Sequence, residues 1–200
     1  MKRNTTSFII PVFNGAEFII GTLNDLIKKI KISQFDFEII VVNDGSSDET
    51  EFMLKKEMDK NNNITVISYK KNMGKGYALK KGVLESTGDI VILLDSDSNI
   101  SLEYLISNLD ELNDFDLVIG SKYHEKSKIY VPLRRKILTK IFHLIVVICT
   151  SIEVSDTQVG LKIGKGTEMR KIFSVMSINR YAFDVELLVI ATLLKLRIKE

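Results

Sequence analysis

Several features that define other classes of protein are scarce in this sequence. It has one cysteine, Cys149, which excludes an internal disulfide and suits a reducing compartment. No uncharged run reaches the roughly 18 residues that a transmembrane helix needs, and Pro11 interrupts the only apolar stretch that could begin a secretory signal. The formal net charge is only +2, which is far from the basic signature of a nucleic-acid-binding protein.

Histidine is equally scarce, and this limits the chemistry that the chain can perform. His124 and His143 do not have the spacing of metal ligands, and neither a Ser-His-Asp nor a Cys-His arrangement can be argued. The remaining composition is that of an ordinary globular protein, with 200 residues and 45% hydrophobic content. This length predicts one domain with a full hydrophobic core.

The first 120 residues alternate short β-branched runs with helical patterns. The runs predict buried strands at Ser7–Phe13, Glu38–Asn43, Ile64–Tyr69, Ile90–Leu94 and Leu117–Ile119. The helical patterns cover Ala16–Lys31, Asp48–Lys60, Lys75–Ser86 and Ser101–Leu112, and a later one covers Phe183–Leu194. This alternation predicts an α/β fold with a mostly parallel sheet that is flanked by helices on both faces.

Polar or turn-forming residues follow four of the predicted strands. They are Asn14-Gly15, Asn43-Asp44-Gly45-Ser46, Asn72-Met73-Gly74-Lys75-Gly76 and Asp95-Ser96-Asp97. In open α/β sheets, ligands bind outside the carboxyl ends of the strands. The topology therefore predicts that these four segments converge on one ligand-binding edge.

Asp95-Ser96-Asp97 directly follows the apolar run Ile90–Leu94. Two carboxylates at this spacing can share a hard divalent cation such as Mg²⁺ or Mn²⁺, which would neutralise the diphosphate of a nucleotide. A solvated turn is the competing interpretation, because Asp and Ser are common in turns. A calcium-binding loop is excluded: Asn99 fits its pattern, but Ile100 and Ile106 stand where that loop needs Gly and Glu.

The other strand ends carry weaker signals. Asp44 can accept hydrogen bonds from a base or ribose, while the Asp-Gly pair makes a turn and Ser47 caps the next helix. Gly74 and Lys75 precede a helix, where glycine permits close approach and the helix N-terminus attracts anions. This segment lacks the P-loop spacing, and taken alone it favours a plain loop. Gly164-Lys165-Gly166 is interpreted as a turn.

The pattern changes after residue 120. Between Ser121 and Lys140 there are seven basic residues and one acidic residue, Glu125. An apolar helix is predicted to follow over roughly Leu133–Cys149. Basic residues before an apolar helix suit a helix that lies in a membrane surface, so we expect peripheral membrane contact. Burial in the core or in an oligomer interface competes with this interpretation, and no pattern fixes an oligomeric state.

Five segments in this order resemble the inverting family-two glycosyltransferases, which have the GT-A (Rossmann-like) fold. They are Ile10-Pro11-Val12-Phe13-Asn14, Val42-Asn43-Asp44-Gly45-Ser46-Ser47-Asp48-Glu49-Thr50, Asn72-Met73-Gly74-Lys75-Gly76, Leu94-Asp95-Ser96-Asp97 and Gly120-Ser121-Lys122. Two later segments, Asp156-Thr157-Gln158-Val159-Gly160-Leu161-Lys162 and Tyr181-Ala182-Phe183-Asp184-Val185-Glu186-Leu187-Leu188, resemble the dolichyl-phosphate glucosyl- and mannosyltransferase group. The second of these looks closer to the glucosyl branch.

The resemblance implies a metal-dependent hexosyltransferase with a nucleotide-sugar donor and a polyprenyl-phosphate acceptor. UDP-glucose is the favoured donor and GDP-mannose the second choice, with Mg²⁺ or Mn²⁺ as the cofactor. The expected location is the cytoplasm, peripherally on the cytoplasmic face of a membrane. One domain would span residues 1–200, with residues 1–120 binding the nucleotide sugar and residues 121–200 forming the acceptor side. A transferase with a saccharide hydroxyl acceptor and a non-catalytic nucleotide-binding protein remain as alternatives.

The resemblance also implies roles for individual residues on the donor side. Asp44 would contact the base in a pocket lined by Phe13, Asn14 and Asn72. Asp95 would contact the ribose or the metal, and Asp97 would bind the metal directly as a catalytic residue. Asn99 takes the place of a polar metal-pocket residue. The matching segments add further candidate donor-binding residues: Pro11, Gly74, Lys75, Ser96 and Lys122, the last in a position where many relatives carry arginine.

On the acceptor side, Arg134 and Arg135 are candidates for binding the acceptor phosphate. Asp156 lies in the acceptor-side motif and is the candidate base if the acceptor is a hydroxyl. Two positions depart from the family pattern, because Asn43 replaces a common aspartate and Gly15 replaces a glutamate. The chain ends at Ile198-Lys199-Glu200, where relatives continue with another strand, so we expect a C-terminal truncation.

Overall fold

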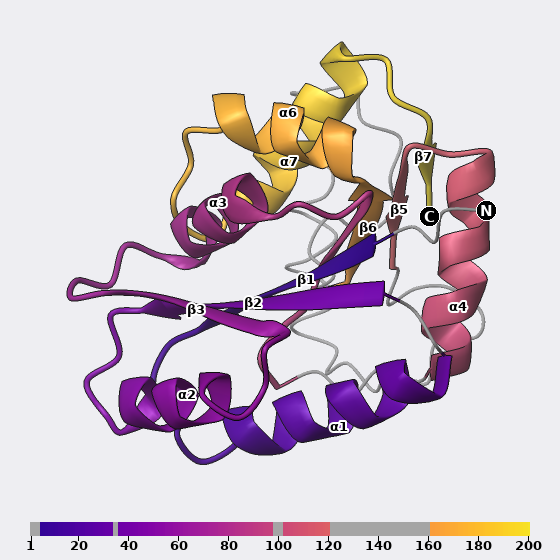
Figure 1. Ribbon diagram of the computed structural model, residues 1–200. Helices are drawn as coiled ribbons and strands as arrows, with labels where there is room; N and C mark the ends of the chain where they lie inside the picture. Colours follow the sequence, from indigo (N-terminus) through magenta and orange to yellow (C-terminus); the bar gives the residue numbers. More distant parts are fainter. Residues whose placement is uncertain (1–4, 34–35, 98–101, 121–160) are drawn as a thin grey trace, which may run out of the picture.

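A computed structural model describes residues 5–33, 36–97, 102–120 and 161–200. Its sheet has the strand order β3-β2-β1-β4-β6-β5-β7 (Figure 1). The strands are β1 (Thr5–Val12), β2 (Asp36–Asp44), β3 (Ile64–Tyr69), β4 (Ile90–Leu93), β5 (Leu117–Ile119), β6 (Lys162–Lys165) and β7 (Ile198–Lys199). β6 runs antiparallel to both its neighbours, whereas the other paired strands are parallel. The predicted α/β fold with a mostly parallel sheet is confirmed.

Both faces of the sheet are buried, which explains why its strands are continuous apolar runs. In β1, Phe8, Ile9 and Ile10 all have no exposed surface, although successive side chains point to opposite faces. One face packs against α3 (Lys75–Glu85), α6 (Gly166–Val175) and α7 (Phe183–Leu193). The other face packs against α1 (Ile19–Ser33), α2 (Thr50–Met58) and α4 (Leu102–Asp110), which ends in the short helix η1 (Glu111–Asn113). Figure 1 shows α3, α6 and α7 above the sheet and α1 and α2 below it, with α4 at its right-hand side.

The bounds of β3 and β5 agree with the predicted strands, and the other predicted strands and helices in the described ranges differ only at their ends. The prediction of a turn at Gly164-Lys165-Gly166 is wrong, because Gly164 and Lys165 belong to β6 and Gly166 begins α6. Gly164 packs directly against the Met169 side chain, so a Cβ there would lie 2.7 Å from Met169 Cγ. Neither α6 nor β7 was predicted.

No helix in the described ranges is long and apolar enough to cross a membrane. The basic stretch and the predicted helix over Leu133–Cys149 lie outside the described residues.

Candidate active site

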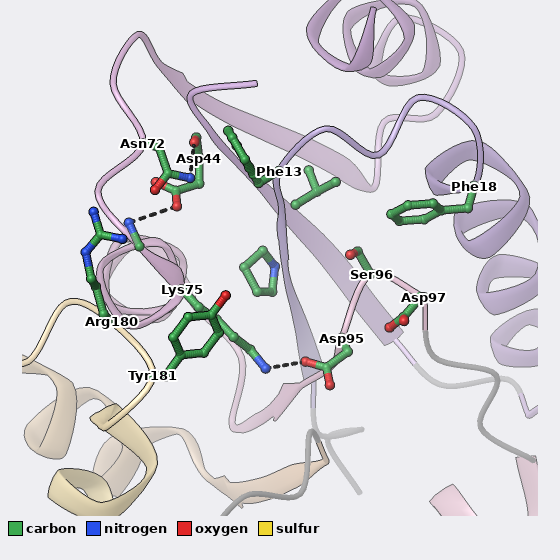
Figure 2. Close-up of a pocket in the computed structure, with 13 residues that line it drawn as sticks. Phe13, Phe18, Asp44, Asn72, Lys75, Asp95, Ser96, Asp97, Arg180 and Tyr181 are labelled. Atoms are coloured by element: carbon green, nitrogen blue, oxygen red, sulfur yellow. Dashed lines mark hydrogen bonds and ion pairs between the residues drawn. The ribbon is translucent and has the colours of Figure 1, made fainter. Parts of the chain in front are cut away.

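A pocket of about 410 Å³ lies where β1, β2 and β4 end. Its lining, drawn in Figure 2, is Pro11, Val12, Phe13, Phe18, Asp44, Asn72, Gly74, Lys75, Asp95, Ser96, Asp97, Arg180 and Tyr181. All four polar strand ends lie at or beside this pocket. The predicted convergence on one edge is therefore confirmed.

Asp44, the last residue of β2, links two of the converging segments. Its two carboxylate oxygens accept hydrogen bonds from the backbone N–H groups of Met73 (2.8 Å) and Gly74 (2.9 Å). The Asn72 side chain in turn donates to the Asp44 backbone carbonyl at 3.1 Å. Gly45 turns the chain with a φ of +70°, and a Cβ there would lie 2.6 Å from the Asn72 backbone nitrogen. Asp44 thus shapes the loop before α3 in addition to facing the pocket.

Asn14 does not line the pocket. Its side-chain oxygen accepts a hydrogen bond from the Ser47 backbone N–H at 2.8 Å, and its own N–H donates to Ser46 Oγ at 2.9 Å. Asn14 therefore joins the loop after β1 to the loop after β2. The prediction that Ser47 caps the next helix is wrong, because α2 begins at Thr50 and it is Asp48 that accepts from the Thr50 N–H.

The Asp95-Ser96-Asp97 segment forms the other end of the pocket. Lys75, the first residue of α3, reaches across to Asp95 with 2.5 Å between Nζ and Oδ1 (Figure 2). Asp97 is exposed. Within the described ranges, no three Asp, Glu, His or Cys side chains gather as a ready-made metal site. The two carboxylates are nevertheless hard oxygen donors of the kind that Mg²⁺ and Mn²⁺ prefer.

Gly74 and Gly76 allow the backbone of residues 178–179 to approach closely. A Cβ on Gly74 would lie 2.6 Å from the Asn179 carbonyl oxygen, and one on Gly76 would lie 2.5 Å from the Ile178 carbonyl oxygen. The Tyr77 N–H also donates to the Asn179 carbonyl at 3.0 Å. Several N–H groups at this end of α3 are thus already bonded within the protein, to Asp44 or to Asn179. These bonds suit the plain loop that the segment favours when it is taken alone, more than an open anion site at the helix N-terminus.

The connector between α6 and α7, residues 176–182, brings Arg180 and Tyr181 to the pocket. Glu186 braces it by accepting hydrogen bonds of 2.8 Å from the N–H groups of Ser177 and Ile178 and from Ser177 Oγ. Burial acts to raise the pKa of Glu186, but these hydrogen bonds outweigh it and hold the pKa below its ordinary value. Sequence reasoning gave Arg180 and Tyr181 no role, although Tyr181 opens one of the segments that resemble the transferase group.

A buried ion pair lies behind the pocket. Lys162 Nζ on β6 is 2.5 Å from Asp184 Oδ1 on α7, and the two side chains are 3% and 10% exposed. Burial lowers the pKa of Lys162 and raises the pKa of Asp184, while their mutual attraction acts in the opposite direction on each. The Phe183 ring is close to both this pair and a pocket residue, since Lys162 Nζ and Lys75 Nζ are each 5.7 Å from its centroid.

The structure thus gathers most of the predicted donor-side residues in one pocket, with Asn14 beside it. Asn99, Lys122, Arg134, Arg135 and Asp156 lie outside the described residues.

Residues 7–178 match the model of Glycosyl transferase family 2, which is most of the chain. The chain belongs to this family. A dolichyl-phosphate beta-glucosyltransferase of Trichomonas vaginalis is 34% identical over 207 residues, covering 97% of this chain and 63% of that protein. The Homo sapiens dolichyl-phosphate beta-glucosyltransferase is 31% identical over 210 residues, covering 97% and 65%. This chain therefore spans slightly less than two thirds of the length of these relatives.

Two solved structures share the GT-A fold of this family 2 chain. One is a mannosyltransferase from Pyrobaculum calidifontis in complex with GDP-Man and Mn²⁺, with a TM-score of 0.71 and 17% identity, covering 100% of this chain and 55% of that one. The other is glucosyl-3-phosphoglycerate synthase from Mycobacterium tuberculosis in complex with Mn²⁺, UDP-glucose and phosphoglyceric acid. Its TM-score is 0.67 at 21% identity, covering 94% and 65%.

Proposed function

We propose that this chain is an inverting hexosyltransferase that moves glucose from UDP-glucose to a polyprenyl phosphate such as dolichyl phosphate. The observation that carries the proposal is the likeness to dolichyl-phosphate beta-glucosyltransferases over 97% of the chain. It is supported by a pocket at the family's donor-binding edge with both carboxylates of Asp95-Ser96-Asp97 in its wall. GDP-mannose is the second candidate donor, in keeping with the mannosyltransferase among the solved structures.

The donor is placed along the pocket, with its base at one end and its diphosphate at the other. The base lies against Phe13 and Asn72, where the Asp44 carboxylate faces the pocket while bonded to the loop before α3. The diphosphate lies toward Asp97, with Asp95 at the ribose or the metal. Pro11, Gly74, Lys75 and Ser96 complete the donor-binding wall, and Lys122 is assigned to it by family resemblance.

A divalent cation, Mn²⁺ or Mg²⁺, fits the donor set of Asp95 and Asp97, with Asn99 as a further candidate ligand. These two carboxylates are few for a tight metal site, so phosphate oxygens and water must complete the coordination. When bound, the cation neutralises the charge of the departing diphosphate. The chain's own contribution is to hold the donor and the acceptor in line for a single displacement, which inverts the anomeric carbon.

A phosphate acceptor changes what the protein must supply. The second pKa of a phosphate monoester is about 6, so the attacking oxygen is largely ionised near neutral pH and needs no strong base. Residues 121–200 form the acceptor side, where Arg134 and Arg135 bind the acceptor phosphate. Asp156 contributes there too, and would be the base only for a hydroxyl acceptor. A lipid acceptor supports peripheral association with a membrane, and we propose its cytoplasmic face.

The acceptor assignment is tested by offering polyprenyl phosphate and soluble oligosaccharides as competing acceptors with UDP-[¹⁴C]glucose. We expect label in the lipid fraction, with the β-anomer in the product. Label that enters only the oligosaccharide fraction would move the function to saccharide extension, and label in neither fraction with any donor would favour a non-catalytic nucleotide-binding protein.

The metal assignment is tested with Asp97→Asn. We expect transfer to fall by at least about a hundredfold, because charge stabilisation of the leaving group is a large part of catalysis. Asp89→Asn is the matched control, since Asp89 precedes β4 and therefore lies at the opposite edge of the sheet from Asp97, which follows it. Metal-dependent transfer that survives in Asp97→Asn would reject the role of Asp97.

A further inference from the structure

Lys75 is paired with Asp95, one of the two carboxylates proposed to bind the metal. Its Nζ lies 2.5 Å from Asp95 Oδ1, and both side chains are only about one third exposed, at 31% and 36%. An ammonium group and a divalent cation on one carboxylate repel each other, and the repulsion is larger where solvent screens less. While Lys75 is paired with Asp95, a metal at Asp95 is therefore disfavoured.

The Lys75 side chain lines the pocket, so its ammonium group can leave Asp95 and still face the pocket. The residue begins α3, and its ammonium group also lies 5.7 Å from the centre of the Phe183 ring. Among the described residues that line the pocket, Lys75 and Arg180 are the two that carry positive charge. A Lys75 side chain that leaves Asp95 thus remains beside the space assigned to the donor diphosphate, where its charge would be attracted.

We propose that Lys75 couples metal binding to nucleotide binding by exchanging Asp95 for the donor diphosphate. Without a nucleotide, Lys75 neutralises Asp95 and competes with the cation. With a nucleotide, Lys75 pairs with the phosphates and releases Asp95 to the cation. This inference rests on the proposed donor chemistry, and it predicts that metal and nucleoside diphosphate each tighten the binding of the other by the same factor.

Removing the Lys75 charge should change the two affinities in opposite directions, with Mn²⁺ binding tighter and UDP binding weaker. A lysine that only binds phosphate would change the UDP affinity alone. Lys75→Met removes the competing charge but keeps an apolar stem against Phe183. We expect Mn²⁺ alone to bind this variant about three- to tenfold more tightly than the wild type. In the presence of saturating Mn²⁺, we expect UDP to bind it about tenfold more weakly, because the phosphates lose a cationic partner. The factor by which Mn²⁺ and UDP assist each other should therefore shrink.

The experiment measures free Mn²⁺ by electron paramagnetic resonance, first without nucleotide and then with UDP or GDP. Calorimetry gives the affinity for each nucleotide with and without Mn²⁺. Lys81→Met is the matched control: it lies on the same helix, is exposed, does not line the pocket, and also has its ammonium group 5.7 Å from a ring, that of Tyr77. Lys75→Arg keeps the charge and should keep Mn²⁺ binding weak, and Lys75→Gln repeats the test with a polar side chain.

Each outcome decides one question. Tighter Mn²⁺ binding in Lys75→Met and Lys75→Gln, but not in Lys81→Met or Lys75→Arg, supports the exchange. Unchanged or weaker Mn²⁺ binding in both neutral variants overturns it while leaving the proposed function intact, provided that the wild type binds UDP or GDP with Mn²⁺. A wild type that binds neither nucleotide overturns the proposed function, and the exchange with it.

Discussion

The buried ion pair between Lys162 and Asp184 allows a prediction about the stability of the protein near the pocket. Asp184→Asn keeps the size of the side chain but removes its charge. Lys162, which is 3% exposed, would then lose the charge of the Asp184 carboxylate. Removing one member of a buried pair costs about 3–5 kcal/mol, because the remaining charge loses its compensation. The free energy of unfolding should fall by about that amount.

An exposed pair of nearly the same length provides the control. Lys55 and Glu51 on α2 lie 2.6 Å apart, but their side chains are 61% and 44% exposed. Solvent screening limits such pairs to about 0.2–1 kcal/mol, so Glu51→Gln should have a small effect. Urea unfolding followed by circular dichroism measures both variants. With a slope of about 2–3 kcal/mol per molar urea, the urea concentration at the unfolding midpoint should fall by about 1–2.5 M in Asp184→Asn.

A third variant separates lost charge from lost packing. Lys162→Met combined with Asp184→Leu replaces the pair by apolar side chains, which is often neutral for stability. We expect it to regain most of the stability lost in Asp184→Asn. Equal losses in Asp184→Asn and Glu51→Gln would refute the argument that burial makes this pair costly to break.

Three further predictions concern the connector and the far edge of the sheet. Gly76→Ala should cost about 1–3 kcal/mol in urea unfolding, because its Cβ would lie 2.5 Å from the Ile178 carbonyl oxygen; unchanged stability would show that the connector yields freely. Glu186→Gln leaves one acceptor oxygen where two are used, so the amide proton of Ser177 or of Ile178 should exchange faster with solvent. Asp116 has its pKa held below the ordinary value chiefly by Lys165, so its stabilising contribution is present above about pH 4 and lost as the pH falls further. The stability difference between wild type and Asp116→Asn should therefore be smaller at pH 2 than at pH 7.

The parts of the fold that were predictable are those whose stability comes from local patterns. The predicted bounds of β3 and β5 are correct because each is a run rich in β-branched residues, and the residues that follow, Lys70 and Gly120, are unfavourable in strands. β6 was not predicted because its sequence, Lys-Ile-Gly-Lys, has no apolar run. It is a strand because it bridges β4 and β5, and both of these partners are distant in the sequence.

The candidate site likewise has a part that could be predicted from the sequence and a part that could not. Its position followed from topology, since the ends of parallel strands share one edge. The two hydrogen bonds from the N–H groups of Met73 and Gly74 to Asp44 could not be predicted from the sequence. Nearly every residue has a backbone N–H group, so residue type does not identify these donors. Arg180 reaches the pocket through a connector that approaches two glycines of another segment. Gly74 and Gly76 indicate a close approach, but nothing in the sequence says that residues 176–182 make it. Taken alone, their segment favours a plain loop, and only Gly74 is assigned to the donor site, by resemblance.

The most direct test of the account is the transfer of [¹⁴C]glucose from UDP-glucose to dolichyl phosphate by the wild-type chain with Mn²⁺ or Mg²⁺. Organic extraction separates the lipid product from the unused donor. The account predicts label in the organic phase that requires the divalent cation and disappears in Asp97→Asn. No lipid-bound label from UDP-glucose or from GDP-[¹⁴C]mannose, with a folded protein that binds UDP or GDP, would contradict it.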